Sequence, residues 1–196
     1  IYDQGRAAPD ELGACLAAGT GPTVVVAQAG EVNTGAFDDL TAIAAAAREH
    51  GAWMHVDGAF GIWARVSPRL DHLVSGLERA DSWAFDAHKW LNVPYDSGIA
   101  VVAHPESHRA AMLGDAAYLA PTSSERDAYD WTPEASRRAR GFAVYAALRS
   151  LGRAGLVDMV ERCCALAKRF AAGLGAIDGA TIINDVVLNQ VLVSFG

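Results

Sequence analysis

Two residues with complementary chemistry stand at the ends of two apolar segments. Asp57 closes an apolar segment that begins at Ala52, and Lys89 follows the apolar segment 82–85. A lysine amine can form a Schiff base with an aldehyde, and a carboxylate can keep a heterocyclic nitrogen protonated. These are the two side chains that pyridoxal 5′-phosphate requires from an enzyme. The pair therefore predicts an enzyme that processes amino acids.

The segments around these two residues are predicted to form a parallel sheet. Residues 23–27 and 52–56 have the composition of buried strands, and residues 38–50 between them have the apolar periodicity of a helix. A strand–helix–strand unit with short connections gives parallel strands joined by a right-handed crossover. Ligands of such sheets bind beyond the carboxyl ends of the strands. Asp57 and Lys89 are therefore expected to face one cofactor site.

The rest of the chain predicts further elements of an α/β protein and one long loop. Asp38 is expected to cap the helix that follows it, because its carboxylate can accept from free backbone N–H groups. The other expected elements are a short helix over 70–79, a strand over 82–85, an antiparallel strand over 98–102, a long loop over 114–131, a helix from Thr132 to about Leu151 that stops at Gly152, a helix over 156–174 and a strand over 190–195.

The composition is typical of a folded protein with no nucleic-acid or membrane partner. Apolar residues make up 52% of the 196 positions and charged residues 20%, which is enough apolar material for a core. The net charge is −7, and the basic cluster Arg137, Arg138 and Arg140 lies in a segment with a helical pattern, so a nucleic-acid surface is not expected. No apolar run reaches the length of a membrane span.

The cysteines and histidines predict neither disulfides nor a metal site. Cys15, Cys163 and Cys164 provide no disulfide framework, which favours a reducing compartment and a cytoplasmic protein. His104 and His108 are four residues apart, but they are expected at a solvated helix end rather than on a metal ion. The chain begins without methionine and ends in a strand-like run, so we expect a piece of a longer protein.

The neighbours of the two principal residues refine the expected site. Gly58 and Ala59 are small, which allows a flat ring to pack beside Ala59. His55 lies on the same side of its strand as Asp57 by alternation, and it either orients Asp57 or is a satisfied core histidine. Asp86 would repel a phosphate dianion, so we expect it to point elsewhere or to bond a backbone amide.

Six short motifs stand in order along residues 20–165. They are Gly35-Ala36-Phe37-Asp38, Trp53-Met54-His55-Val56-Asp57-Gly58-Ala59, Ala80-Asp81-Ser82, Asp86-Ala87-His88-Lys89-Trp90-Leu91, Ser136-Arg137-Arg138 and Leu148-Arg149-Ser150-Leu151-Gly152. In this order the chain resembles the group II pyridoxal phosphate-dependent amino-acid decarboxylases, the family of glutamate, aromatic-amino-acid and histidine decarboxylases. The resemblance implies fold type I (aspartate aminotransferase-like) and a homodimer.

The resemblance also implies roles for individual residues. Lys89 would be the Schiff-base lysine, Asp57 would bind the pyridine nitrogen, and His88 would lie near the phosphate. Family decarboxylases use a tyrosine of a mobile loop to protonate the substrate carbanion. Tyr129 stands in the equivalent loop of this chain, and Tyr118 is a second candidate.

One loop departs from the family pattern. Family members often carry two threonines just after the glycine that ends the first strand, and this chain has Glu31 and Val32 there. Asn33 and Thr34 follow directly, so they are the candidates for contacts to cofactor or substrate in this loop.

The expected reaction is the decarboxylation of an L-amino acid to its amine. The same lysine and acid also serve aminotransferases and carbon–carbon lyases or aldolases, and a catalytically silent cofactor-binding relative is a further alternative. We expect residues 1–150 to be the later part of a cofactor-binding large domain. Residues 151–196 are expected to begin a small C-terminal domain, which the chain truncates.

Overall fold

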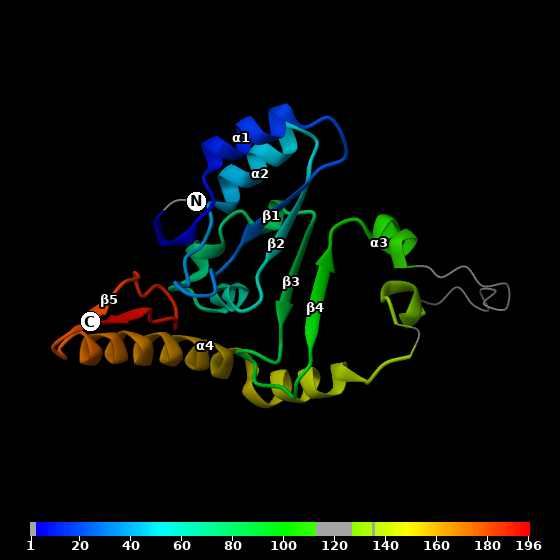
Figure 1. The fold of residues 1–196 in the computed structure, drawn as a ribbon. Helices are drawn as coiled ribbons and strands as arrows, with labels where there is room; N and C mark the ends of the chain where they lie inside the picture. Colours follow the sequence, from blue (N-terminus) through cyan, green and yellow to red (C-terminus); the bar gives the residue numbers. More distant parts are fainter. Residues whose placement is uncertain (1–2, 113–126, 135) are drawn as a thin grey trace.

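The computed structural model describes residues 3–112, 127–134 and 136–196, and a four-stranded sheet lies at its centre (Figure 1). The strands stand in the order β1-β2-β3-β4. The helices and strands are α1 (Pro9–Ala18), β1 (Val24–Gln28), α2 (Leu40–Glu49), β2 (Trp53–Asp57), β3 (Ser82–Asp86), β4 (Gly98–Val102), α3 (Pro105–Met112), α4 (Arg140–Leu174), β5 (Ala180–Ile182) and β6 (Val193–Phe195). Short 3-10 segments join them: η1 (Asp3–Gly5), η2 (Gly61–Val66), η3 (Asp71–Val74), η4 (Leu77–Arg79) and η5 (Ala128–Trp131). Tyr118 and most of the expected loop 114–131 lie outside the described residues.

The sheet has the expected mixed topology. β1, β2 and β3 are parallel, and β4 returns antiparallel to β3, as the short connection between them predicts. All four strands lie within one residue of the segments expected from their apolar composition. The carboxyl ends of β1, β2 and β3 therefore meet at one edge of the sheet, and the chain that follows each strand begins there.

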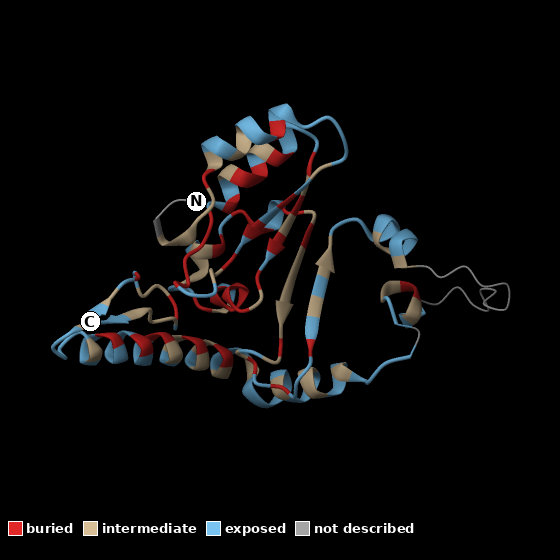
Figure 2. Cartoon of the chain, in the orientation of Figure 1, coloured by how far each residue is buried: buried red, intermediate tan, exposed pale blue. Residues whose placement is uncertain are grey.

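Helix α2 packs against one face of β1 and β2, and helix α1 packs on α2. The side of α2 that faces the sheet carries Leu40, Ile43 and Ala47, which are buried as their helical spacing predicts (Figure 2). β1 alternates between buried and exposed residues. Its outward-facing residues Val24 and Val26 remain 62% and 61% exposed, so the second face of β1 is uncovered by the described chain.

The expected cap of α2 was assigned to the wrong carboxylate. Asp39, not Asp38, caps the helix, and its Oδ1 accepts from the backbone N–H of Ala42. Asp38 is buried, and its two oxygens accept from the backbone N–H groups of Ala7 and Gln28. The sequence alone does not distinguish the two adjacent aspartates as helix caps. Asp38 is instead used by the backbone N–H groups of Ala7 and Gln28, which leaves Asp39 as the cap.

The expected helix over 70–79 is also wrong, because this segment forms the two separate 3-10 turns η3 and η4. Gly76 lies between the turns with φ +97°, a left-handed conformation that ends a right-handed helix. A Cβ at Gly76 would come within 2.7 Å of the backbone nitrogen of Thr41. The turn is therefore fixed by its packing against the start of α2.

The long helix α4 starts later than its sequence signature indicates. Thr132 was expected to begin it, but the Thr132 hydroxyl donates to the Glu134 carbonyl and the helix begins at Arg140. The intervening segment is held by Arg138, which donates to the carbonyls of Tyr95 and Asp96. The expected stop at Gly152 is confirmed as a break, because its non-helical backbone (φ 61°, ψ −177°) divides α4 into two helical segments, and the second segment ends at Leu174 as expected.

The C-terminal segment forms a two-stranded hairpin along the second half of α4 (Figure 1). The expected strand 190–195 is shorter than predicted, because β6 covers only its last three residues and pairs antiparallel with β5. Among the described helices, α4 included, we find none that is long and apolar enough to cross a membrane.

Candidate active site

Sheet register brings Asp57 and the segment that carries Lys89 to the same edge. Asp57 is the last residue of β2 and pairs with Ala84 of β3. Beyond this pair, the Gly58 N–H donates to the Ala84 carbonyl and the Asp86 N–H donates to the Ala59 carbonyl. The chain after β2 therefore follows the end of β3 closely, and Lys89 comes three residues beyond that end.

The segment around Lys89 is fixed by a small apolar cluster. Ala87, Leu91 and Val93 are buried, and they belong to one cluster with Leu156 and Val160 of α4. The apolar residues on both sides of Lys89 thus anchor the backbone. The lysine side chain itself remains 41% exposed at the edge of the sheet.

The Lys89 amine is held by a carboxylate of its own turn. Its Nζ lies 2.9 Å from Oδ2 of Asp86, and it stands 5.8 Å from the centre of the Phe60 ring. Asp86 was expected to point away from the site or to bond a backbone amide. The structure contradicts this expectation, because the attraction of the neighbouring ammonium outweighs the alternatives.

His88 is oriented by the backbone of Ser97. The Ser97 N–H donates to Nδ1 of His88 over 2.9 Å, and the Ser97 side chain is buried. The Ser97 carbonyl oxygen also lies 3.1 Å from Nδ1, so the backbone of Ser97 offers this nitrogen both a donor and an acceptor. Nε2 lies 3.7 Å from Oδ2 of Asp86, and the ring packs 4.4 Å from the Tyr95 ring.

Asp57 is exposed and Oδ1 of its carboxylate accepts from the backbone N–H of Ala59. This bond fixes the turn after β2 and leaves Oδ2 able to accept from a second donor. Nδ1 of His55 lies 2.8 Å from the Ser82 hydroxyl. Of the two alternatives for His55, the structure supports a satisfied histidine bonded to β3 rather than a partner of Asp57.

The loop after β1 reaches the same edge, where Glu31 organises it. Asn33 and Thr34 both donate to the Glu31 carboxylate, from their backbone N–H groups and from their side chains. Burial alone would raise the pKa of Glu31, but these hydrogen bonds outweigh it and lower the pKa. Asn33 is exposed, whereas Thr34 is buried and its hydroxyl also contacts the Gln4 carbonyl at 2.7 Å.

Tyr129 lies near the opposite end of the sheet. β4 is antiparallel to β3, so its last residue pairs with Ser82 at the start of β3, and α3 follows there. Arg109 of α3 binds Asp130 of η5 with an N–O distance of 3.0 Å. Tyr129 is therefore held beside α3 (Figure 1), and the described chain does not bring it to Lys89.

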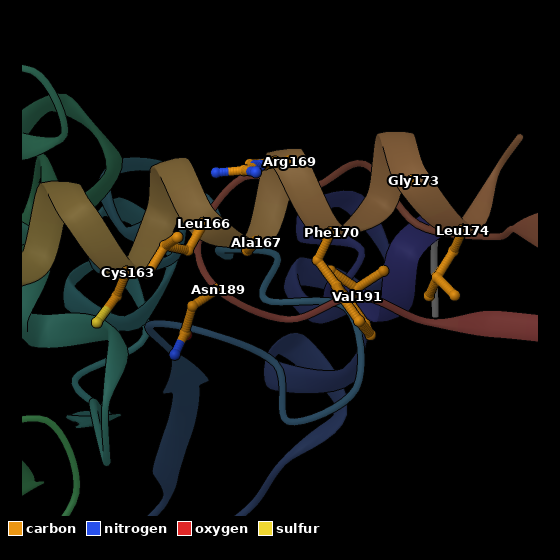
Figure 3. A pocket seen from close by; sticks show the side chains of 9 residues that line it. All are labelled: Cys163, Leu166, Ala167, Arg169, Phe170, Gly173, Leu174, Asn189 and Val191. Atoms are coloured by element: carbon orange, nitrogen blue, oxygen red, sulfur yellow. The ribbon is translucent and has the colours of Figure 1, made fainter.

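One groove of the described structure is separate from this edge. A groove of about 840 Å³ lies along the second half of α4 (Figure 3). Its lining is mainly apolar, from Cys163, Leu166, Ala167, Arg169, Phe170, Gly173, Leu174, Asn189 and Val191. None of the predicted site residues lines it. In the described parts of the chain we also find no cluster of three potential metal ligands, and Nε2 of His104 contacts Asp81 instead.

Sequence reasoning missed two residues of the site. The backbone of Ser97 orients the His88 ring, and the only sequence signal of Ser97 is a place in the turn before a strand. Glu31 gathers Asn33 and Thr34, although the sequence presented it only as a departure from a family pattern. Both residues act through backbone amides, which the side-chain pattern does not reveal.

Comparison with protein families and relatives identifies the chain. The family model described as the pyridoxal-dependent decarboxylase conserved domain matches residues 5–196. A tryptophan decarboxylase of Camptotheca acuminata is 34% identical over 164 residues, which is 82% of this chain and 33% of the relative. An aromatic-L-amino-acid decarboxylase of Drosophila lebanonensis is 34% identical over 158 residues, 80% of this chain and 39% of that protein. The chain thus spans about a third of the length of such relatives.

Solved structures agree with this match. Mouse CSAD in its apo form superposes with a TM-score of 0.89 at 26% identity, covering 100% of this chain and 42% of that one. Oryza sativa TDC, solved with pyridoxal phosphate and tryptamine, gives a TM-score of 0.87 at 27% identity over 94% of this chain and 39% of that one. The fold is that of a partial type I pyridoxal phosphate enzyme, as expected. This chain belongs to the pyridoxal-dependent decarboxylase family.

Proposed function

We propose that the full-length protein binds pyridoxal 5′-phosphate and uses it to decarboxylate an L-amino acid to its amine. The observation that carries this proposal is the sheet register that pairs Asp57 with Ala84, five residues before Lys89. The two side chains that the cofactor requires thus share one edge. The matching family model and the relatives named as decarboxylases support the same reaction.

The donor set at this edge fits the cofactor. The aldehyde group requires an amine, which Lys89 presents on a rigid segment, and the pyridine nitrogen requires the carboxylate that Asp57 presents to solvent. A flat ring needs small neighbours such as Ala59. The negative charge of Asp86 would oppose a phosphate, but Nε2 of His88 lies 3.7 Å from its carboxylate and remains beside it when Lys89 binds the cofactor.

Each residue has a defined task in this proposal. The bound cofactor supplies an electron sink that lets carbon dioxide leave the substrate Cα. Lys89 holds the aldehyde carbon of the cofactor covalently between turnovers, and Asp57 keeps a proton on the pyridine nitrogen. His88 lies near the phosphate, with its ring oriented by the backbone of Ser97. Tyr129, or Tyr118, returns a proton to Cα.

The loop after β1 supplies the remaining proposed contacts. Asn33 and Thr34 stand at the same edge as Asp57, and both are ordered by Glu31. We assign them to the cofactor-binding side of the site. Asn33 is the better placed of the two for a direct contact, because its side chain is exposed while Thr34 is buried.

The name of one relative points to a second possible product of the same site, an aldehyde. A phenylacetaldehyde synthase of a Rosa hybrid cultivar is 32% identical over 159 residues, 79% of this chain and 31% of the relative. Its name describes an aldehyde product rather than an amine. The assay must therefore identify amine and aldehyde separately, and it also detects the keto acid that an aminotransferase would release.

The wider organisation of the protein is part of the same proposal. We assign residues 1–150 to a cofactor-binding large domain and residues 151–196 to the start of a small domain. The kink at Gly152 lies close to this boundary. The full-length protein is proposed to be a cytoplasmic homodimer with an amino-acid substrate.

The decisive experiment compares Lys89→Ala with wild-type full-length protein. Both are supplied with pyridoxal phosphate and a panel of L-amino acids, and products are identified by mass spectrometry. Loss of the attached amine is expected to lower amine formation by about 10³-fold or more, as for other covalent nucleophiles. Lys168→Ala is the matched control, because it removes an exposed lysine of α4.

Two outcomes would contradict the proposal. If Lys89→Ala keeps near wild-type activity, Lys89 is not the cofactor lysine. If the wild-type protein forms an aldehyde or a keto acid in place of an amine, the decarboxylase assignment is wrong while Lys89 keeps its role.

A further inference from the structure

We propose that Asp86 is a positioning residue that holds the unreacted Lys89 amine and slows its reaction with electrophiles. The inference deepens the proposed function and rests on it, because it concerns how the cofactor lysine is kept before it reacts. It is carried by contacts that the sequence reasoning did not anticipate for Asp86.

The carboxylate is in a fixed place from which to hold the amine. Asp86 is the last residue of β3, paired with Gly98 on one side, while its N–H donates to the Ala59 carbonyl on the other. Strand β4 and the segment after β2 thus hold the Asp86 backbone from both sides. Oδ2 lies 2.9 Å from Nζ of Lys89, and the Asp86 side chain is only 25% exposed.

The amine has a second contact that defines its position. Nζ of Lys89 lies 5.8 Å from the centre of the Phe60 ring, within the range of a cation–π interaction. Phe60 is buried, so the packing around it holds its ring in place. The amine is therefore held between a carboxylate and an aromatic ring, and it must leave these contacts before it reacts with an electrophile.

Asp86 keeps a partner when Lys89 leaves. Nε2 of His88 lies 3.7 Å from the same Oδ2, while Nδ1 of the ring contacts the backbone of Ser97. A small movement brings the imidazole into hydrogen-bond range. The carboxylate can thus exchange one donor for the other without being left unpaired. The step that Asp86 slows is the separation of the Lys89 amine from the Asp86 carboxylate.

The chain offers an internal reference for measuring this effect. It has two lysines, Lys89 and Lys168, and Lys168 is exposed on α4. Full-length protein stripped of cofactor is treated briefly with acetic anhydride, a small uncharged reagent, at a fixed pH. Mass spectrometry then gives the ratio of acetylation at Lys89 to acetylation at Lys168.

Asp86→Asn is expected to raise this ratio by about two- to fivefold, the value of a partly exposed ion pair. Asp158→Asn is the matched control, since it removes an exposed carboxylate of α4, and its ratio should equal that of the wild type. Salt gives a second test that needs no variant. About 1 M sodium chloride screens exposed ion pairs and should raise the wild-type ratio toward that of Asp86→Asn.

An unchanged or lower ratio in folded Asp86→Asn overturns the proposal. If that variant does not fold, a wild-type ratio that salt leaves unchanged overturns it. The assay requires no turnover, so it is independent of the proposed reaction. Failure of the wild-type protein to form an amine would refute the proposed function and leave the measured ratio valid.

Discussion

At the scale of single residues, Tyr129 has surroundings that suit a proton donor. Partial burial raises the pKa of its phenol, and the carboxylates of Asp130 and Asp127 raise it further, because each disfavours the phenolate. Tyr129 therefore stays protonated across the neutral range and above it. Its distance from Lys89 within one chain leaves the catalytic role a prediction.

We predict that Tyr129→Phe lowers kcat for amine formation by about 10²- to 10⁴-fold, the contribution of a general acid. Cofactor binding, followed by absorbance of the full-length protein, should be unchanged because the ring remains. Tyr145→Phe is the matched control, since it removes an exposed phenol from α4. If Tyr129→Phe keeps the wild-type kcat, the proton comes from another group, with Tyr118 as the next candidate.

The site could be foreseen only in part from its residues. Lys89 and Asp57 were predicted because each follows an apolar strand, and a parallel sheet sets such positions at one edge. The ion pair of Lys89 with Asp86 was not predicted. The pair depends on the turn after β3, where the backbone brings residues three positions apart together. The expected repulsion between the Asp86 carboxylate and a cofactor phosphate argued against it.

At the scale of elements, close approach of two loops shapes the edge that carries the site. A Cβ on Gly61, at the start of η2, would overlap the carbonyl of Ala29, the residue that follows β1. Gly30 adopts φ +99°, and a Cβ there would lie 2.7 Å from the Phe60 ring. These two glycines allow the chain after β1 and the chain after β2 to pass each other. The position of the Phe60 ring, which lies beside the Lys89 amine, depends on this close approach.

Gly61→Ala is predicted to lower the free energy of unfolding by about 1–3 kcal/mol, because backbone on both sides must shift to admit the methyl group. Chemical denaturation of the full-length protein measures this change. Gly141→Ala provides the control, since apart from its own stretch of α4 no described atom lies within 4 Å of its Cβ position, and it should be neutral or stabilising. Equal stability of the two variants would show that the loops can separate without cost.

Elements were predictable where local and long-range signals agreed. The sheet strands and the buried face of α2 follow from apolar periodicity alone, because the same periodicity governs their packing. The start of α4 was not predictable. Thr132 begins a good local helix signature, but Arg138 binds the carbonyls of Tyr95 and Asp96, which lie more than forty positions earlier, and these bonds keep the segment extended.

At the scale of the whole molecule, Asn184 joins the C-terminal unit to the edge that carries the site. Its buried Nδ2 donates to the Thr34 carbonyl over 2.8 Å and to the Gln190 carbonyl over 3.0 Å. Its Oδ1 accepts from the Leu192 N–H. One amide side chain therefore satisfies backbone groups of both the loop after β1 and the segment before β6.

We predict that Asn184→Ala speeds hydrogen exchange at the amides of residues 31–36, because each buried partner left unpaired costs about 1–3 kcal/mol. Mass spectrometry of peptides from the full-length protein measures this rate. Asn189→Ala, an exposed amide of the same unit, should leave the rate unchanged. Identical exchange in the two variants would mean that the loop is ordered without Asn184.

The bond from Asn184 to Thr34 spans 150 positions of the chain, and this has a consequence for how the sequence can diverge. Substitutions in the loop after β1 alter the backbone that Asn184 must reach, and changes around Asn184 alter the reach itself. Neither segment can drift freely while the other stays the same. A lineage that acquires a new substrate preference through this loop is therefore expected to carry compensating changes near its C-terminal hairpin.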